Sequence, residues 1–90
     1  MSDCVFCKIV SGEFRATVVG ETDRSLAFKD IAPRQPLHIL VIPKAHHANV
    51  AELSINDPES LVDLMQLGSK LASELTTGHF RFTFNTGEMA

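Results

Sequence analysis

The most apolar stretch of the chain covers residues 37–42, LHILVI, in which His38 is the only polar residue. A strand buried on both faces reads as a continuous apolar run, whereas a strand with one wet face alternates. Pro43 ends the run, because proline cannot donate a hydrogen bond to a ladder. We therefore predict a central strand here. A turn over residues 30–36, which contains two prolines, precedes it.

Shorter patterns predict the elements around this strand. Residues 4–10 can form a short helical turn, the β-branched residues 17–19 read as a strand, and residues 26–28 form its antiparallel neighbour. Residues 48–55 have mixed character and are expected to be irregular. The strongest helix signal covers 58–75, where apolar residues recur at helical spacing. Asp57 suits the N-cap of this helix and Pro58 suits its first position.

Phenylalanines alternate with polar residues over 80–85, which predicts a half-buried final strand. Strands before and after one long helix indicate an α+β domain, with an antiparallel sheet and the helix packed on one face. A turn follows the aromatic strand at once, so we expect a partner strand that these residues do not supply. Residues 1–90 are thus predicted to be a single domain that is incomplete at its C-terminal end.

Composition and charge narrow the classes of function. Ninety residues with 44% hydrophobic content form one small domain, and the formal net charge of −3 does not attract nucleic acid. No stretch approaches the roughly 20 apolar residues that a membrane span needs. The N-terminus lacks the pattern of a secretory signal, so we expect a cytoplasmic protein without membrane or nucleic-acid partners. In that compartment the two cysteines are expected to be thiols or metal ligands.

Cys4 and Cys7 stand at the spacing at which two thiolates can grip one zinc ion. A structural zinc site needs four ligands, so histidines would have to complete it, with His46 and His47 as the first candidates and His38 and His79 behind them. Two other interpretations remain open at this point, namely two thiols without a metal and a redox pair.

Several polar residues lie at the ends of the apolar run. His38 is either a core histidine with both ring nitrogens satisfied or a site residue that positions another group by hydrogen bonding. Asp30 is either a turn cap or a ligand-binding carboxylate that accepts two sugar hydroxyls, and Asn85 is either a strand-end amide or a ligand-binding amide that both donates and accepts. Phe6 and Phe28 are core residues or the walls around a flat base. None of these residues completes a catalytic constellation.

Four segments follow one another in an informative order, namely CVFCKI at 4–9, LAFKDIAP at 26–33, PLHILVIPKAH at 36–46 and FNTG at 84–87. In this order they resemble the histidine triad (HIT) family, and most closely its Hint-like branch of purine nucleotide-binding hydrolases. In the family a His-φ-His-φ-His strand follows the last segment after a short link. The resemblance therefore implies a histidine nucleophile that lies beyond Ala90.

The resemblance also implies roles for individual residues. His38 would support the triad by hydrogen bonding, and Asp30 would accept the ribose hydroxyls. Cys4, Cys7 and His46 would bind a structural zinc ion whose fourth ligand is the first triad histidine, and catalysis would need no metal. The base and ribose pocket, with Asn85 on the phosphate side, would comprise Val5, Phe6, Ile9, Phe28, Asp30, Ile31, Leu40 and Asn85.

The activity implied by the resemblance is hydrolysis or transfer at the α-phosphate of purine nucleoside phosphoramidates or dinucleotides, with a nucleotidyl-histidine intermediate. The family forms homodimers through the helix and a strand, so a homodimer is expected. If the chain ends at Ala90, two alternatives replace the enzyme: a non-catalytic module that binds purine nucleotides, and a zinc-stabilised interaction module.

Overall fold

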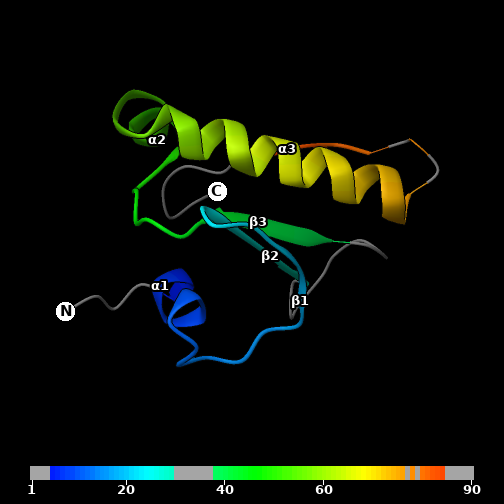
Figure 1. The fold of residues 1–90 in the computed structure, drawn as a ribbon, viewed down its shortest axis with the longest axis horizontal. Helices are drawn as coiled ribbons and strands as arrows, with labels where there is room; N and C mark the ends of the chain where they lie inside the picture. The colour runs from blue at the N-terminus through cyan, green and yellow to red at the C-terminus, as the bar shows by residue number, and fades with distance from the viewer. Residues whose placement is uncertain (1–4, 30–37, 77, 79, 85–90) are drawn as a thin grey trace.

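The computed structural model describes residues 5–29, 38–76, 78 and 80–84. The elements follow one another in the order helix, three strands, two helices (Figure 1). Their bounds are α1 Val5–Val10, β1 Val18–Glu21, β2 Ser25–Lys29, β3 Ile39–Pro43, α2 Val50–Asn56 and α3 Pro58–Leu75. Among the described residues, no helix is both long enough and apolar enough to cross a membrane.

The three strands form one antiparallel sheet in the order β1-β2-β3. The register of β2 against β3 is regular, with Phe28 opposite Leu40 and Ser25 opposite Pro43. Within the described part of the chain, β2 is the middle strand and β3 lies at an edge. The predicted central place of residues 37–42 in the complete sheet stays a prediction, and β3 contacts packed residues on both of its faces.

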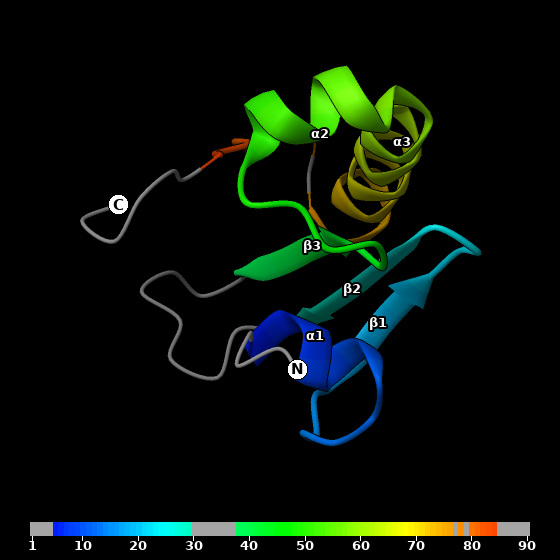
Figure 2. The ribbon, with the colours of Figure 1, turned by 90° about the vertical axis from the view of Figure 1, so that its left-hand side faces the viewer.

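Each face of the sheet is covered by a different helix (Figures 1 and 2). Side chains of successive strand residues point to opposite faces. Ala27 accordingly packs with Leu67 and Leu71 of α3, and Ile39 and Val41 pack against this cluster. On the other face, a second cluster contacts the α1 residues Ile9 and Val10 and also Leu40; it consists of Leu26, Phe28 and Ile42. This two-sided burial explains the continuous apolar run.

The long helix α3 has the predicted bounds and the predicted N-terminal cap. The Asp57 side chain accepts a hydrogen bond from the backbone N–H of Ser60 at 3.4 Å, and Pro58 is the first helical residue. Thr76 caps the other end of the helix. The α+β class, with an antiparallel sheet and one long helix on a face, is confirmed.

Helix α2 corrects the expectation of irregular structure over residues 48–55. Its N-cap is Asn49, whose side chain accepts the backbone N–H of Glu52 at 2.9 Å. The Glu52 side chain in turn accepts the N–H of Ala48 at 3.3 Å. The Asn49 cap satisfies an N–H of the first turn that a short helix would otherwise leave without a partner.

The prediction of a strand over residues 80–85 is not confirmed, because residues 80–84 have no strand structure. A strand needs a ladder partner for its backbone groups, and among the described residues none pairs with this segment. Phe80 and Phe82 instead lie with their ring centroids 5.2 Å apart, and both remain about half exposed. Residue 85 lies outside the described residues.

Two local features hold α3 against the sheet. Asp63 of α3 accepts hydrogen bonds from the hydroxyls of Thr22 and Ser25, the latter at 2.6 Å, and Ser25 is fully buried. Beside this contact, Gly20 of β1 lets the helix approach closely. A Cβ atom at Gly20 would lie 3.2 Å from side-chain carbons of both Leu67 and Leu71.

Candidate functional site

The predicted base pocket forms where α1 packs on the sheet. Phe6 of α1 lies with its ring centroid 6.4 Å from that of Phe28, at an interplanar angle of 46°. Phe28 is 3% exposed, whereas Phe6 is 46% exposed. Phe28 therefore belongs to the core, and Phe6 presents an aromatic ring to solvent beside it. An exposed ring next to an apolar cluster is a suitable surface for a flat ligand.

The structure brings four of the predicted pocket residues together. Ile9 and Leu40 both pack against the apolar cluster that contains Phe28, which itself contacts Phe6. Val5 is the first residue of the same helix, α1. Three further predicted site residues lie outside the described residues, namely Asp30, Ile31 and Asn85.

The structure brings two residues of the predicted metal site close together. Sγ of Cys7 lies 3.1 Å from Nδ1 of His46, although 39 residues separate them. Two zinc ligands at about 2.3 and 2.0 Å in tetrahedral geometry lie roughly 3.5 Å apart, so this pair fits a shared ion with a small shift. Cys4 lies outside the described residues. Among the described residues, no cluster of three metal-binding side chains is present.

The ring of His47 lies near two carboxylates and does not join the Cys7–His46 pair. Its Nδ1 lies 3.4 Å from a carboxylate oxygen of Glu52, and its Nε2 lies 3.7 Å from a carboxylate oxygen of Asp57. Hydrogen bonding with Ser60 holds the pKa of Asp57 below its ordinary value of 3.8, and the charges of Arg24 and His47 lower that pKa further. This cluster joins the loop after β3 to the start of α3.

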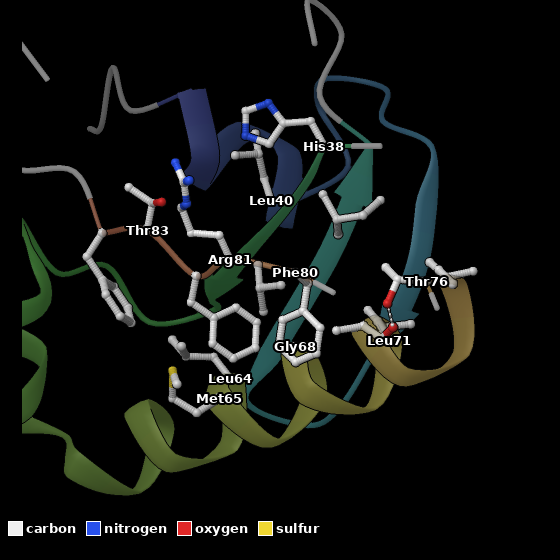
Figure 3. Close-up of a pocket in the computed structure, with 16 residues that line it drawn as sticks. His38, Leu40, Leu64, Met65, Gly68, Leu71, Thr76, Phe80, Arg81 and Thr83 are labelled. Atoms are coloured by element: carbon white, nitrogen blue, oxygen red, sulfur yellow. Dashed lines mark hydrogen bonds between the residues drawn. The ribbon is translucent and has the colours of Figure 1, made fainter. Parts of the chain in front are cut away.

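His38 is exposed and lies immediately before β3. The interpretation of His38 as a core histidine is therefore wrong. The residue lines a groove of about 860 Å³ between β3, α3 and residues 80–84. Figure 3 shows His38 and Met65 on opposite sides of this groove. Gly68 lies on α3 between Met65 and Thr76.

Sequence reasoning missed this groove. Its floor consists of apolar and small residues of α3, such as Leu64, Gly68 and Leu71, which the helical spacing had marked only as core. The alternating phenylalanines at 80–84 were the available signal, because they predicted a strand that needs a partner. The spacing of apolar residues in α3 does not show which of them line a groove.

The chain is similar to known proteins over nearly its whole length. Residues 3–89 match a family model described as "Scavenger mRNA decapping enzyme C-term binding". The chain is 41% identical over 87 residues to adenosine 5'-monophosphoramidase hnt1 of Schizosaccharomyces pombe, a match that covers 97% of this chain and 63% of that protein. It is 39% identical over 90 residues to protein HitA of Neisseria gonorrhoeae, covering 98% of this chain and 83% of that protein.

Solved structures agree in fold. The HIT family hydrolase from Clostridium thermocellum superposes with a TM-score of 0.90 at 38% identity, covering 100% of this chain and 80% of the other. A histidine triad protein from Clostridium difficile superposes with a TM-score of 0.87 at 36% identity, covering 99% and 79%. The chain therefore spans about four fifths of these structures, and less than two thirds of the Schizosaccharomyces pombe relative.

Proposed function

Because this chain belongs to the histidine triad (HIT) family, we propose that it is the larger part of a purine nucleotide-binding hydrolase. The observation that carries the proposal is the exposed Phe6 ring beside the buried Phe28. A purine can stack on this surface, with Ile9 and Leu40 at its edge. Val5 and Ile31 complete the proposed pocket.

Polar residues would orient the rest of the nucleotide. In this proposal Asp30 accepts hydrogen bonds from the two ribose hydroxyls, because a carboxylate offers several acceptor sites to a vicinal diol. Asn85 lies on the phosphate and leaving-group side, where an amide can both donate and accept. His38 supports the nucleophilic histidine by hydrogen bonding.

The proposed reaction is nucleophilic displacement at the α-phosphorus. A neutral imidazole of a histidine beyond Ala90 attacks the phosphorus, the P–N bond to the leaving amine or the P–O bond to the leaving phosphate breaks, and the leaving group takes up a proton. Water then cleaves the nucleotidyl-histidine bond and releases the nucleoside monophosphate. The substrates are purine nucleoside phosphoramidates or dinucleotides. Adenosine 5'-monophosphoramidase is the name carried by one relative.

We also propose that a structural zinc ion binds next to α1, held by Cys4, Cys7 and His46. The short distance between Cys7 and His46 supports this assignment, because it joins α1 to the loop after β3. Zinc bound there would act as a cross-link between these segments. The hydrolytic step needs no metal in this proposal.

The assembly and location of the protein are further parts of the proposal. We expect a cytoplasmic homodimer that associates through α3 and the segment after it. Val62 and Leu75 of α3 and the phenylalanines of residues 80–84 are exposed, so apolar surface is available for such an interface.

The test is hydrolysis of adenosine 5'-phosphoramidate by the full-length protein, followed by release of adenosine monophosphate. The enzyme proposal predicts release, together with a covalent nucleotidyl adduct in rapidly quenched samples. Binding of adenosine monophosphate without any hydrolysis would leave the non-catalytic binding module. One zinc ion per chain with no nucleotide binding at millimolar concentration would leave only the zinc-stabilised module.

A further inference from the structure

The base-stacking residue Phe6 and the zinc-site residue Cys7 are consecutive on α1, Val5–Val10. A helix of six residues is not stable by itself, because isolated helices shorter than about 12 residues are marginal in water. Ile9 and Val10 pack this helix against the apolar cluster of the sheet (Figures 1 and 2). The orientation of Phe6 therefore depends on the contacts that fix α1.

A second contact fixes α1 from a different part of the chain. Sγ of Cys7 lies 3.1 Å from Nδ1 of His46, in the loop between β3 and α2. Both ends of this loop are held by hydrogen bonds. The backbone N–H of Lys44 donates to the carbonyl of Arg24 at 2.8 Å, and the Asn49 side chain caps α2. His46 thus belongs to a segment that is anchored to the β1–β2 turn and to α2, and it contacts Cys7 from there.

The Cys7–His46 contact joins the two sides of the proposed base pocket. Phe6 comes from α1, whereas Leu40, which packs against the same cluster as Phe28, comes from β3. The loop that contains His46 follows β3 directly. Consecutive residues of a helix point about 100° apart around its axis. Cys7 therefore acts on the pocket through the position of α1 and not by touching the base.

We propose that metal occupancy at Cys7 and His46 regulates purine binding at Phe6. Zinc shared by the two side chains fixes α1 on the sheet, so the stacking surface is formed before the purine arrives. In the metal-free protein the purine must also order the helix, and this cost weakens its binding. The coupling rests on the proposed function, and it goes further because the zinc ion there is only a structural cross-link.

Coupling between two sites is reciprocal. The purine must therefore raise the affinity for zinc by the same factor by which zinc raises the affinity for the purine. Such coupling typically changes affinity by about 5- to 150-fold. We expect a value at the low end of this range, because packing of Ile9 and Val10 keeps α1 partly docked when the metal is absent.

The test is adenosine binding to the full-length protein, measured by calorimetry with zinc bound and after a chelator has removed the metal. Adenosine has no phosphate, so its affinity reports on the base and ribose side alone. We expect its Kd to rise about fivefold when the metal is removed and to recover when zinc is added back. Competition with a chelating dye gives the reciprocal measurement, in which saturating adenosine should raise the zinc affinity by the same factor.

Three variants separate this coupling from a general loss of structure. His46→Ala should bind adenosine with the weaker affinity of the metal-free native protein, whether or not zinc is added. Phe6→Ala should still bind zinc, but its adenosine affinity should no longer respond to the metal. Phe14→Ala is the matched control, because its ring is similarly exposed at 43% and contacts Lys8 rather than the apolar cluster. Its response to zinc should persist.

The proposal is overturned if adenosine binds equally well to the zinc-loaded and the metal-free protein, an outcome that leaves the proposed function intact. It is also overturned if circular dichroism shows that the metal-free protein is unfolded, because zinc would then hold the whole domain and not α1 in particular. A zinc response that survives in Phe6→Ala would likewise contradict it. Absence of adenosine binding in both states would instead reject the proposed base pocket, and the coupling with it.

Discussion

Sγ of Cys7 on α1 lies 3.1 Å from Nδ1 of His46 in the loop after β3, and this contact joins segments 39 residues apart. It is the part of the predicted zinc site that the structure describes. The adjacent His47 has its ring nitrogens near Glu52 and Asp57 instead. Consecutive side chains of an extended segment point apart, which is why only one of the two histidines reaches the cysteine.

This arrangement predicts that the full-length protein binds one zinc ion per chain and that Cys7→Ser or His46→Ala abolishes stoichiometric binding. Loss of one of four ligands leaves an incomplete tetrahedral site. Metal content after dialysis, measured by mass spectrometry, checks the prediction. His47→Gln is the matched control and should retain the metal. Equal zinc loss in all three variants would contradict this ligand set.

The exposed aromatic surface predicts that Phe6→Ala weakens binding of adenosine monophosphate. Removal of one stacking ring should cost about 1 kcal/mol, or roughly a fivefold rise in Kd by calorimetry. Phe14→Ala is the matched control, because Phe14 is similarly exposed at 43% but contacts Lys8 rather than the apolar cluster. Equal effects of the two substitutions would show that the base does not stack on Phe6.

The contact between α3 and the β1–β2 turn predicts that Asp63→Ala destabilises the fold. The substitution removes the acceptor of two hydroxyl donors and leaves the fully buried Ser25 without this partner. An unsatisfied buried donor costs about 1–3 kcal/mol. Urea denaturation measures the loss. The exposed Asp23 serves as the control, and Asp23→Ala should change the unfolding free energy by less than about 0.5 kcal/mol.

The same carboxylate predicts acid sensitivity. Hydrogen bonds from Ser25 and Thr22 hold the pKa of Asp63 below its ordinary value of 3.8, and the charges of Arg24 and Lys44 lower that pKa further. The folded state therefore binds a proton at Asp63 less readily than the unfolded state does. The stabilisation is complete above about pH 5 and is lost as the pH falls through the pKa of the folded state.

Urea midpoints measured between about pH 6 and pH 3 test this prediction. We expect the midpoint to fall toward acid pH in the native chain, and to fall less steeply in Asp63→Asn, where the titrating group is absent. The pKa of Asp57 is lowered as well, so part of the slope should remain in that variant. A midpoint with the same pH dependence in both proteins would contradict a role for Asp63.

Close packing at Gly20 predicts that Gly20→Ala is destabilising, although alanine is normally compatible with a strand. The added methyl group would lie 3.2 Å from carbons of Leu67 and Leu71, and overpacking of this kind costs about 1–3 kcal/mol. In the double variant Gly20→Ala with Leu71→Ala, the loss should be smaller than the sum of the single losses. Additive losses would show that the methyl group is accommodated elsewhere.

Features that depend on local pattern could be predicted from the amino-acid sequence. The long helix over 58–75 followed from its apolar period and from the Asp57–Pro58 start, and both of its predicted ends match α3. The two-sided burial of β3 followed from its continuous apolar run. Local signals succeed here because capping and the repeat of apolar positions act within a few residues.

Other features depend on contacts between segments that are far apart in the sequence. Residues 80–84 have the alternation of a strand, but a strand forms only against a partner edge, and sequence period does not supply one. Gly20 and Gly68 look alike in the sequence, yet one lies against α3 side chains and the other forms the floor of an open groove. The nearness of Cys7 to His46 likewise depends on how α1 docks on the sheet, because a contact across 39 residues is set by packing and not by local preference.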